Sequence, residues 1–451
     1  MALDVKQLEK EILEEYLADD NNRPWIIGFS GGKDSTMLLQ LVWNTIKKHI
    51  PPEARSLTGR PIHIVCNNTL VENPKILEFV RRTIKNIRKA AVRDQMPITV
   101  QETTPKLEDS FWVNLIGKGY PAPNNMFRWC TERLKISPTT RFITSKINQH
   151  GEVIILLGTR SDESSNRARS IKKYEVEGTR LRKHTLPNAY VFNPIKDVLT
   201  KEVWTYLLQA PSPWNGTNKE LITLYNNSSG GDCPLVTDIS TPSCGNSRFG
   251  CWVCTVVKKD KSMEALIGNG EDWMEPMMEI RDFLASTINR EDENYNVEKY
   301  RMPVRRNFAD GPGPYWPDVR KHILEMVLRA QKIIQQEQKD VELITYQELV
   351  AIQVIWHRDF IFDHSVAAIY NEIFDRQIQI EAETDSLRRE KEILKECCST
   401  DSEFHLINNM LKAQRNKILL VNKKGLQNDI ENILEEHLYP TFTHVYKRDN
   451  S

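Results

Sequence analysis

The first half of the chain alternates short apolar runs with amphipathic segments. The apolar runs lie at 25–29 (WIIGF), 61–67 (PIHIVCN), 97–103 (PITVQET) and 152–159 (EVIILLGT). Segments with helical periodicity separate them, one beginning at about Ser35 and another covering 73–94. Strands that alternate with helices are typical of a parallel sheet with crossover connections. The pattern therefore predicts an α/β fold whose ligands bind beyond the carboxyl ends of the strands.

The pattern changes after about residue 205. Residues 205–320 are rich in Pro, Gly, Asn, Ser and Trp and show little periodicity. Helical periodicity returns at 317–338, 382–398 and 428–439. We therefore predict three regions, namely an α/β domain with an N-terminal helix at 1–210, an irregular Cys-rich region at 211–316, and a helical C-terminal region at 317–451.

The N-terminal segment is acidic, and Leu8, Ile12 and Tyr16 recur in it at four-residue steps. This predicts an amphipathic helix and not a secretory signal. No apolar run reaches the length of a membrane span, so we expect a cytoplasmic protein with no membrane partner. Eight cysteines in such a chain of 451 residues indicate a reducing compartment and not a disulfide framework.

A polar loop, Ser30-Gly31-Gly32-Lys33-Asp34-Ser35, joins the first predicted strand to the helix that follows. The free N–H groups and the dipole of a helix N-terminus favour anions. The glycines allow close backbone approach, and the Ser and Lys side chains add donors. A turn that only connects a strand to a helix would not require Lys and two Ser at these offsets. The loop therefore predicts a phosphate site.

The loop lacks the four residues that separate the glycines of a Walker motif, and it resembles the PP-loop of the ATP pyrophosphatases, which include the phosphoadenylylsulfate reductases. Residues 156–170 resemble the G-x-R-x-x-E-S-x-x-R segment of the reductase branch, with Gly158, Arg160, Glu163, Ser164 and Arg167. The resemblance implies a PP-loop domain that binds ATP and Mg²⁺ and cleaves ATP between its α and β phosphates. It implies that the six loop residues, Gly158, Arg160 and Arg167 bind the nucleotide, with Lys33 and Asp34 in catalysis.

Other segments also resemble this superfamily. Residues 193–207 resemble its Pro-Ile-x-Asp segment and the Val-Trp helix that follows, and 128–138 resemble a further reductase segment. Asn67 and Asn68 end the second predicted strand, where many reductases have Asp-Thr-Gly. This departure disfavours phosphoadenylylsulfate as the substrate.

Four of the eight cysteines lie within 22 residues and have the spacing C-x10-C-x6-C-x2-C. They are Cys233, Cys244, Cys251 and Cys254. Four thiolates suit either tetrahedral zinc or an iron–sulfur cluster, and the spacing alone does not choose between them. The structural alternative is a set of four free, buried thiols.

The PP-loop, the segment around Cys130, the four cysteines and the helical tail together resemble the DndC-type DNA phosphorothioation sulfurtransferases and a similar component of the Ssp modification system. The resemblance covers about residues 20–320. It implies that the four cysteines hold a 4Fe–4S cluster. The implied partners are DNA, a cysteine desulfurase and other phosphorothioation subunits. The implied reaction replaces a non-bridging oxygen of a DNA phosphodiester with sulfur after activation by ATP.

Cys130 is the expected sulfur carrier. Arg128 and Arg133 flank it in sequence, and nearby positive charge favours a reactive thiolate. A buried structural cysteine is the alternative at this position. Cys66 lies in a strand pattern and is expected in the core, whereas Cys397 and Cys398 follow a predicted helix and receive no role.

The formal net charge is zero, so a DNA surface must come from local clustering. One candidate is 167–184, with seven Lys and Arg (167, 169, 172, 173, 180, 182 and 183) against two Glu, and another is 300–308, where two aromatic residues bracket three arginines. A solvated charged loop is the alternative. Three other functions remain open, namely a phosphoadenylylsulfate reductase, a tRNA thiolation enzyme and a nucleotide-sensing scaffold without turnover.

Overall fold

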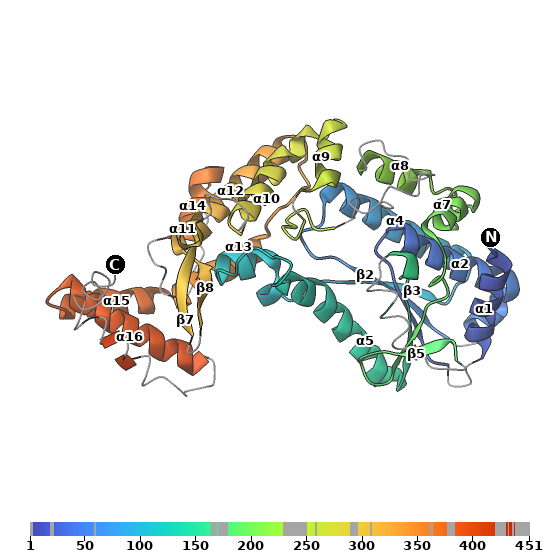
Figure 1. The fold of residues 1–451 in the computed structure, drawn as a ribbon, viewed down its shortest axis with the longest axis horizontal. Coiled ribbons are helices and arrows are strands. Elements are labelled where there is room, and N and C mark those ends of the chain that lie inside the picture. Colours follow the sequence, from blue (N-terminus) through green and yellow to red (C-terminus); the bar gives the residue numbers. More distant parts are fainter. Residues whose placement is uncertain are drawn as a thin grey trace, which may run out of the picture. The chain divides into compact units, whose positions relative to one another are not determined.

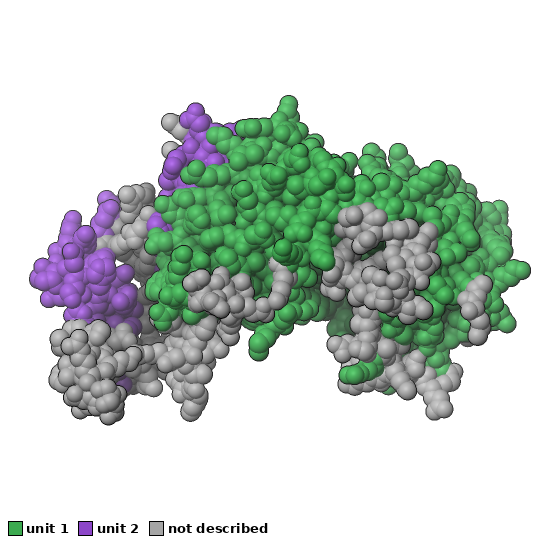
Figure 2. Space-filling view, turned by 45° about the horizontal axis from the view of Figure 1, so that its top comes forward, with its two compact units in different colours: residues 1–348 green, residues 349–451 purple. Residues whose placement is uncertain are grey.

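The computed structural model describes most of the chain. The described residues are 3–18, 22–57, 60–163, 169, 179–228, 250–257, 259–288, 296–306, 309–359, 361, 364–376, 384–419, 430–431, 433–434 and 437. They form two compact units, residues 1–348 and residues 349–451, which Figure 2 colours separately. No helix in the described part is long and apolar enough to cross a membrane.

A six-stranded sheet forms the centre of the first unit (Figure 1). Its strand order is β3 (Ile98–Thr103), β2 (Ile62–Asn67), β1 (Trp25–Gly28), β4 (Val153–Leu156), β6 (Ala189–Phe192) and β5 (Leu181–Lys183). All neighbouring strands are parallel except β5 and β6. The predicted α/β fold with a parallel sheet is therefore confirmed. The strands β5 and β6 were absent from the prediction because they are short and only one of them is buried.

Helices cover both faces of this sheet. The first core contains Trp25 and Ile27 of β1 and buried residues of α1 (Val5–Leu17), α2 (Lys33–His49), α4 (Pro74–Arg93), α7 (Thr200–Gln209) and α8 (Lys219–Ser228). The second core contains Ile26 of β1 and Ile143 of α5 (Ser137–His150). Successive strand side chains point to opposite faces, so the apolar runs are buried on both sides, as parallel sheets require.

The rest of the first unit consists of short elements and one helix of 21 residues, α12 (Pro317–Glu337). The short elements are α3 (Pro52–Leu57), η1 (Leu107–Asp109), η2 (Val113–Gly117), η3 (Thr131–Ile136), η4 (Ser161–Glu163), α9 (Lys261–Gly268), η5 (Asp272–Met274), α10 (Glu275–Ser286), α11 (Val297–Tyr300), and the hairpin β7 (Arg301–Arg306) and β8 (Ala309–Tyr315). The region predicted to be irregular thus contains α8 to α11 and a hairpin. These helices have at most 12 residues, so each gives only a short stretch of periodicity.

The division into units differs from the three predicted regions, because α12 belongs to the first unit. The buried guanidinium of Arg320 donates to the backbone oxygens of Tyr315 at 2.9 Å and Gly117 at 3.2 Å. The assignment of α12 to the first unit therefore depends on long-range contacts, which sequence periodicity does not reveal.

The second unit is helical. It contains most of α13 (Tyr346–Arg358), followed by α14 (Val366–Phe374), α15 (Thr384–Cys397) and α16 (Asp401–Leu419). The predicted helix at 382–398 is confirmed by α15. The predicted helix at 428–439 lies mostly outside the described residues.

Candidate active site

The polar loop Ser30–Ser35 lies where β1 ends and α2 begins, at the carboxyl edge of the sheet. Gly31 has φ +76°, and a Cβ atom built on it would lie 2.5 Å from Cγ2 of Val80. Only glycine adopts this backbone conformation without strain, and only glycine leaves room for Val80. Gly32 is the N-cap of the 17-residue helix α2, and it provides no side-chain cap. The helix N-terminus therefore presents backbone N–H groups to the loop.

Three side-chain hydroxyl groups accept hydrogen bonds from backbone N–H groups of the loop. The Ser35 Oγ accepts from the backbone N–H of Ser30 at 3.3 Å, and the Ser30 Oγ accepts from Gly32 at 3.4 Å. The backbone N–H of Lys33 donates to the hydroxyl of Tyr225 in α8 at 3.2 Å. These contacts are long for hydrogen bonds and are therefore weak. A phosphate oxygen could replace them at small cost, which fits the predicted anion site.

Asp34 lies between two cations. Its Oδ2 is 2.9 Å from Lys33 Nζ, and its Oδ1 accepts from Arg160 Nε at 2.7 Å. Arg160 is only 1% exposed and also donates to the Val198 carbonyl and to Thr200 Oγ1, each at 3.0 Å. Arg160 therefore anchors Asp34 from behind the loop. The predicted contact of Arg160 with the nucleotide and the predicted catalytic role of Asp34 stay predictions.

Gly158 faces the same helix N-terminus. A Cβ atom on Gly158 would lie 3.0 Å from the Asp34 carbonyl carbon and 3.1 Å from the Ser35 nitrogen. The segment after β4 thus packs closely against the first turn of α2. Glu163 ends the short helix η4, whereas Ser164 and Arg167 lie outside the described residues. The structure brings Gly158 and Arg160 to the loop, as the motif predicted.

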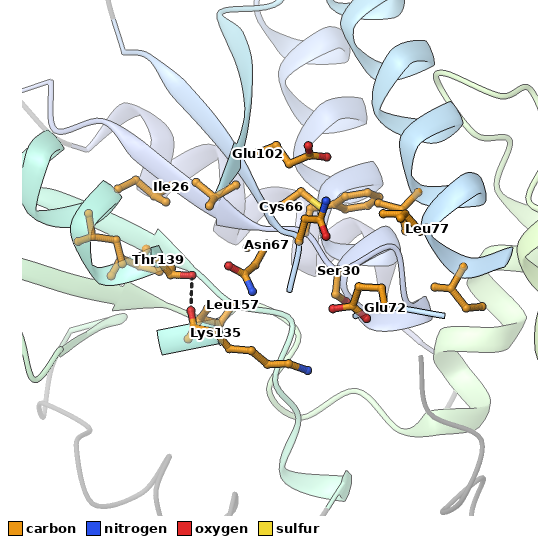
Figure 3. Close-up of a pocket in the computed structure, with 18 residues that line it drawn as sticks. Ile26, Ser30, Cys66, Asn67, Glu72, Leu77, Glu102, Lys135, Thr139 and Leu157 are labelled. Atoms are coloured by element: carbon orange, nitrogen blue, oxygen red, sulfur yellow. Dashed lines mark hydrogen bonds between the residues drawn. The ribbon is translucent and has the colours of Figure 1, made fainter. Parts of the chain in front are cut away.

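A pocket with a volume of about 280 Å³ opens beside the loop (Figure 3). Apolar side chains of β1, β2, β4, α4 and α5 form most of its wall. Its polar lining includes Ser30, Asn67, Glu72, Glu102 and Lys135. Figure 3 shows Ser30 and Glu72 close together, with the Lys135 side chain extended toward them. A mostly apolar cavity with a few polar groups beside an anion site suits a nucleotide.

A second wall of this region comes from residues 250–254, far away in sequence. The backbone N–H of Asn73 donates to the Gly250 carbonyl at 3.3 Å, and that of Trp252 donates to the Val71 carbonyl at 3.1 Å. Glu72 and Cys251 form an antiparallel bridge between these segments. The Cys251 Sγ lies 3.2 Å from the Thr69 hydroxyl. The C-x-x-C segment is therefore paired with the loop that follows β2, and Asn68 and Glu72 of that loop line the pocket.

Cys130 belongs to the same group of thiols. Burial and the charge of Cys254 raise the pKa of Cys130, and Lys135 opposes them. Burial and Glu72 raise the pKa of Cys251 to about 12. The negative charge of the Cys251 thiolate raises the pKa of Lys135. Such mutual effects require proximity, so Cys130, Cys251 and Cys254 lie within electrostatic reach of Lys135, which also lines the pocket.

The expectation that Arg128 and Arg133 favour a Cys130 thiolate is wrong. Arg133 forms an ion pair with Asp109 and donates to the Tyr120 hydroxyl at 3.1 Å. Arg128 donates to the Asn125 side chain at 2.8 Å. Both guanidinium groups are thus engaged elsewhere, and burial raises the pKa of the Cys130 thiol. The prediction of Cys66 in the core is confirmed, since Cys66 is 4% exposed.

The other predicted ligands and surfaces are only partly described. Cys233 and Cys244 lie outside the described residues, and among those described no group of three or more His, Cys, Asp or Glu is arranged to bind a metal ion. In the predicted DNA segment 167–184, Arg180 forms an ion pair with Glu14, and Lys183 is exposed on β5. In 300–308, Arg301 donates to the Gly313 carbonyl at 2.7 Å.

Sequence reasoning missed several site residues. Tyr225 bonds Lys33 and also lies 5.8 Å from the Lys33 ammonium, measured to its ring centroid. Lys135 and Glu72 line the pocket, and Thr69 contacts Cys251. Lys135 lies in segment 128–138, which resembles a reductase segment, whereas Tyr225, Glu72 and Thr69 belong to no motif. The amphipathic pattern of α8 was the only sequence signal available for Tyr225.

Comparisons with known proteins show the family. A family model of the phosphoadenosine phosphosulfate reductase domain matches residues 24–257, which is more than half of the chain. The chain is similar to an uncharacterized protein of Methanocaldococcus jannaschii, with 30% identity over 193 residues, 43% of this chain and 33% of that protein. It is also similar to an uncharacterized nin region protein of Escherichia phage lambda, with 25% identity over 154 residues, 31% of this chain and 48% of that protein.

The chain thus spans between a third and a half of the length of these curated relatives. Among solved structures, it is similar to a phosphoadenylyl-sulfate reductase from Candida auris in a phosphate complex. The match covers 48% of this chain and 91% of that chain, with 15% sequence identity and a TM-score of 0.29.

Proposed function

The chain belongs to the phosphoadenosine phosphosulfate reductase domain family, and from this premise we propose that it uses ATP to activate a DNA phosphate and then transfers sulfur to it. The family indicates an enzyme that acts on nucleotide and sulfur substrates. The proposed product is a DNA phosphorothioate, and the proposed sulfur source is a cysteine desulfurase. Other subunits of such a modification system are the proposed partners.

The observation that carries the proposal is that the loop shares one pocket with Lys135, a residue close to the thiols. Ser30 and Lys135 line the same cavity, and Lys135 lies within electrostatic reach of Cys130 and Cys251. Segment 250–254 pairs with residues 71–73, which continue from the end of β2. A nucleotide phosphate at the α2 N-terminus would therefore lie near a thiol that can carry sulfur.

The first proposed step activates the phosphate. A non-bridging oxygen of a DNA phosphodiester attacks the α-phosphorus of ATP, and the bond to the β-phosphate breaks, so that pyrophosphate leaves. The backbone N–H groups of Gly32 and Lys33 and the Lys33 ammonium group stabilise the charge that develops on the pyrophosphate. Asp34 holds Lys33 in position, and Arg160 holds Asp34. The product is a DNA phosphate joined to AMP by an anhydride bond.

The second proposed step transfers sulfur. The terminal sulfur of a Cys130 persulfide attacks the DNA phosphorus, and AMP leaves with the oxygen that it had joined. A thiol reductant then attacks the Cys130 sulfur and forms a mixed disulfide with it, which breaks the S–S bond to the transferred sulfur and releases the phosphorothioate. A second thiol reduces the mixed disulfide and frees Cys130. The Lys135 ammonium group lies where it can stabilise the anionic sulfur before attack.

The described cysteines fit part of the proposed 4Fe–4S site. Cys251 and Cys254 are free thiols on one short segment, with a Cys254 N–H to Cys251 carbonyl bond of 3.2 Å. This turn brings two soft ligands together, as an iron–sulfur cluster requires. With Cys233 and Cys244 they would hold a cluster, which would supply redox-active iron. None of the steps above depends on it.

The test is mass spectrometry of enzymatically digested DNA from cells that express the chain with its partner subunits. The wild-type chain should yield phosphorothioate dinucleotides, and Cys130→Ser should abolish them. Purified Cys130→Ser should still release pyrophosphate and AMP from ATP, whereas Lys33→Ala should release neither. Normal phosphorothioate in the Cys130→Ser cells would rule out this carrier, and release of ADP by the wild type would rule out the cleavage.

A matched control separates chemistry from folding. Cys397→Ser removes an exposed thiol from the second unit, and it should leave both ATP cleavage and phosphorothioate unchanged. Cys130→Ser should also keep the wild-type unfolding midpoint. A fall in the midpoint together with loss of all activities would indicate a structural role for Cys130.

Phosphoadenylylsulfate reduction is the second candidate, and the family match favours it. The strand end argues against it, because the Asn67 amide donates to the Leu134 carbonyl at 2.8 Å. An Asp at this position, as in many reductases, would place a carboxylate against that carbonyl. Sulfite release from phosphoadenylylsulfate and a thiol reductant would favour this candidate over DNA modification.

A further inference from the structure

The helix α4 carries a concentration of positive charge that contrasts with the neutral chain. Its 20 residues include seven Lys and Arg and one Glu. Its apolar residues Ile76, Phe79, Ile84 and Ile87 are buried in the first core. The cations therefore gather on the opposite, exposed face of the helix, which is labelled in Figure 1.

Some of these cations already have partners. Arg82 forms ion pairs with Glu78 and Glu220, and Arg93 pairs with Asp94. Arg88 donates to the carbonyl of Val100 at 3.2 Å, which leaves its charge uncompensated.

Arg81, Lys85 and Lys89 differ from them, because they are exposed and make no ion pair with any residue in the described part of the chain. They recur at four-residue steps and thus follow one side of the helix. Their backbone positions span about 12 Å, since each residue advances the helix by about 1.5 Å.

From this face we infer that α4 binds the phosphate backbone of duplex DNA. The inference rests on the proposed function, which supplies DNA as the polyanion. Duplex DNA carries one charge per about 1.7 Å of its axis, so a row of three cations about 12 Å long meets several phosphates. Nothing in such a contact reads bases, so the surface would hold DNA without regard to sequence.

The position of the face suits the reaction. Arg81 directly follows Val80, which lines the pocket and approaches Gly31 of the loop. A DNA backbone held by Arg81 would therefore lie within about one helical turn of the proposed nucleotide pocket. The basic face begins where the phosphate has to be activated.

A membrane surface is a poorer occupant. Helices that lie on membranes insert an apolar face next to their basic residues. The apolar face of α4 is buried against the sheet, and Val92 is the large apolar residue that its exposed side retains, with 81% exposure. Charge alone remains for binding, which suits a nucleic acid backbone.

The test compares the full-length wild type with the triple variant Arg81→Ala, Lys85→Ala, Lys89→Ala. Fluorescence anisotropy with a fluorescein-labelled DNA duplex of about 30 base pairs measures affinity from about 50 to about 200 mM salt. Each lost phosphate contact should lower the salt slope by about 0.9. Over this range the wild type should lose about 40-fold more affinity than the variant loses. An unchanged slope would overturn the inference.

The control removes three exposed cations elsewhere in the same unit, by Lys261→Ala, Arg329→Ala and Lys339→Ala. It has the same net charge as the test variant, so an equal loss of DNA binding in both would overturn the assignment to α4. Vesicles of phosphatidylserine provide a second probe. Loss of vesicle binding with retained DNA binding in the test variant would also overturn it.

The two proposals fail in different ways. If the test variant loses DNA binding but keeps ATP cleavage, the basic face is supported whether or not phosphorothioate forms. If wild-type cells make no phosphorothioate while the salt slope still depends on these cations, the proposed reaction fails and the DNA surface stands. If the test variant binds DNA with the wild-type salt slope and phosphorothioate formation is normal, the inference about α4 fails alone.

Discussion

The loop Ser30–Ser35 and the thiol wall around Cys251 border one pocket, but they are built differently. The loop is a continuous segment, and its hydroxyls bond to its own backbone. The thiol wall combines three segments distant in sequence, residues 69–73, 130–135 and 250–254. The loop therefore depends on local geometry, whereas the wall depends on tertiary packing.

The loop and the thiol wall are held in place by different numbers of contacts. The loop is fixed by one buried anchor, Arg160, and by the space that Val80 leaves at Gly31. The thiol wall is fixed by several modest contacts, among them the Asn67 bond to Leu134. Loss of the buried loop anchor should therefore have a larger effect than loss of any single contact in the wall.

The largest effect is expected for Arg160→Ala. It removes one partner of a buried ion pair and leaves Asp34 without its main anchor, which costs about 3–5 kcal/mol of the free energy of unfolding. Arg160→Lys keeps a charge but cannot bridge Asp34, Val198 and Thr200 together, so it should recover only part of the loss. Urea unfolding measures both. A loss below about 1 kcal/mol for Arg160→Ala would contradict the anchoring role.

On the wall, Asn67→Asp should have the next largest effect. The amide donates to the Leu134 carbonyl at 2.8 Å and accepts from the Thr103 hydroxyl at 3.0 Å. Asp keeps the acceptor but faces the carbonyl with a negative charge, at a cost of about 1–3 kcal/mol. Leu134 belongs to η3, which begins directly after Cys130. Loss of the bond to Leu134 should therefore loosen this segment, and iodoacetamide should alkylate Cys130 faster.

The control for this variant is Thr103→Val, which removes the other hydrogen bond of Asn67 and leaves the bond to Leu134. It should cost about 0.5–1.5 kcal/mol and leave the alkylation rate of Cys130 near that of the wild type. Equal alkylation rates in Asn67→Asp and the wild type would show that the strand end does not hold the thiol wall.

Gly31→Ala tests the loop itself. The residue would have to keep φ near +76°, which costs about 1–2 kcal/mol, and its methyl group would meet Val80. Pyrophosphate release should fall by about 100-fold, equivalent to about 2.7 kcal/mol of the barrier. Val80→Ala added to Gly31→Ala should restore part of this by removing the clash. Wild-type release rates in Gly31→Ala would contradict a close phosphate approach.

The same comparison explains what the sequence could predict. The strands, the loop and the spacing of Cys251 and Cys254 are local patterns, and their positions follow from hydrophobic periodicity and turn chemistry. The contact of Tyr225 with Lys33, and the pairing of segment 250–254 with the loop after β2, join distant parts of the chain. Arg160 is predictable only in part. Its motif placed it at the loop, but its burial depends on tertiary packing.

The smallest effect is expected for substitution of Asp162, which contacts Arg160 and Thr200 and not the loop itself. Its Oδ2 accepts from the backbone N–H and the hydroxyl of Thr200, each at 2.9 Å, and from Arg160 at 3.4 Å. Burial alone would raise the pKa of Asp162, but these hydrogen bonds and the Arg160 charge outweigh it, so the pKa is lowered. A lowered pKa in the folded state means that folding favours the ionised carboxylate.

The contribution of Asp162 to stability is therefore fully present above its unfolded pKa, about 3.9, and is lost as the pH falls through the lower folded value. Asp162→Asn should be less stable than the wild type in urea unfolding at pH 7, and the difference should shrink as the pH falls below about 4. The exposed Asp340→Asn is the control and should change stability little at either pH. A wild-type advantage over Asp162→Asn that stays constant through this range would show that the Asp162 charge does not support the anchor of the loop.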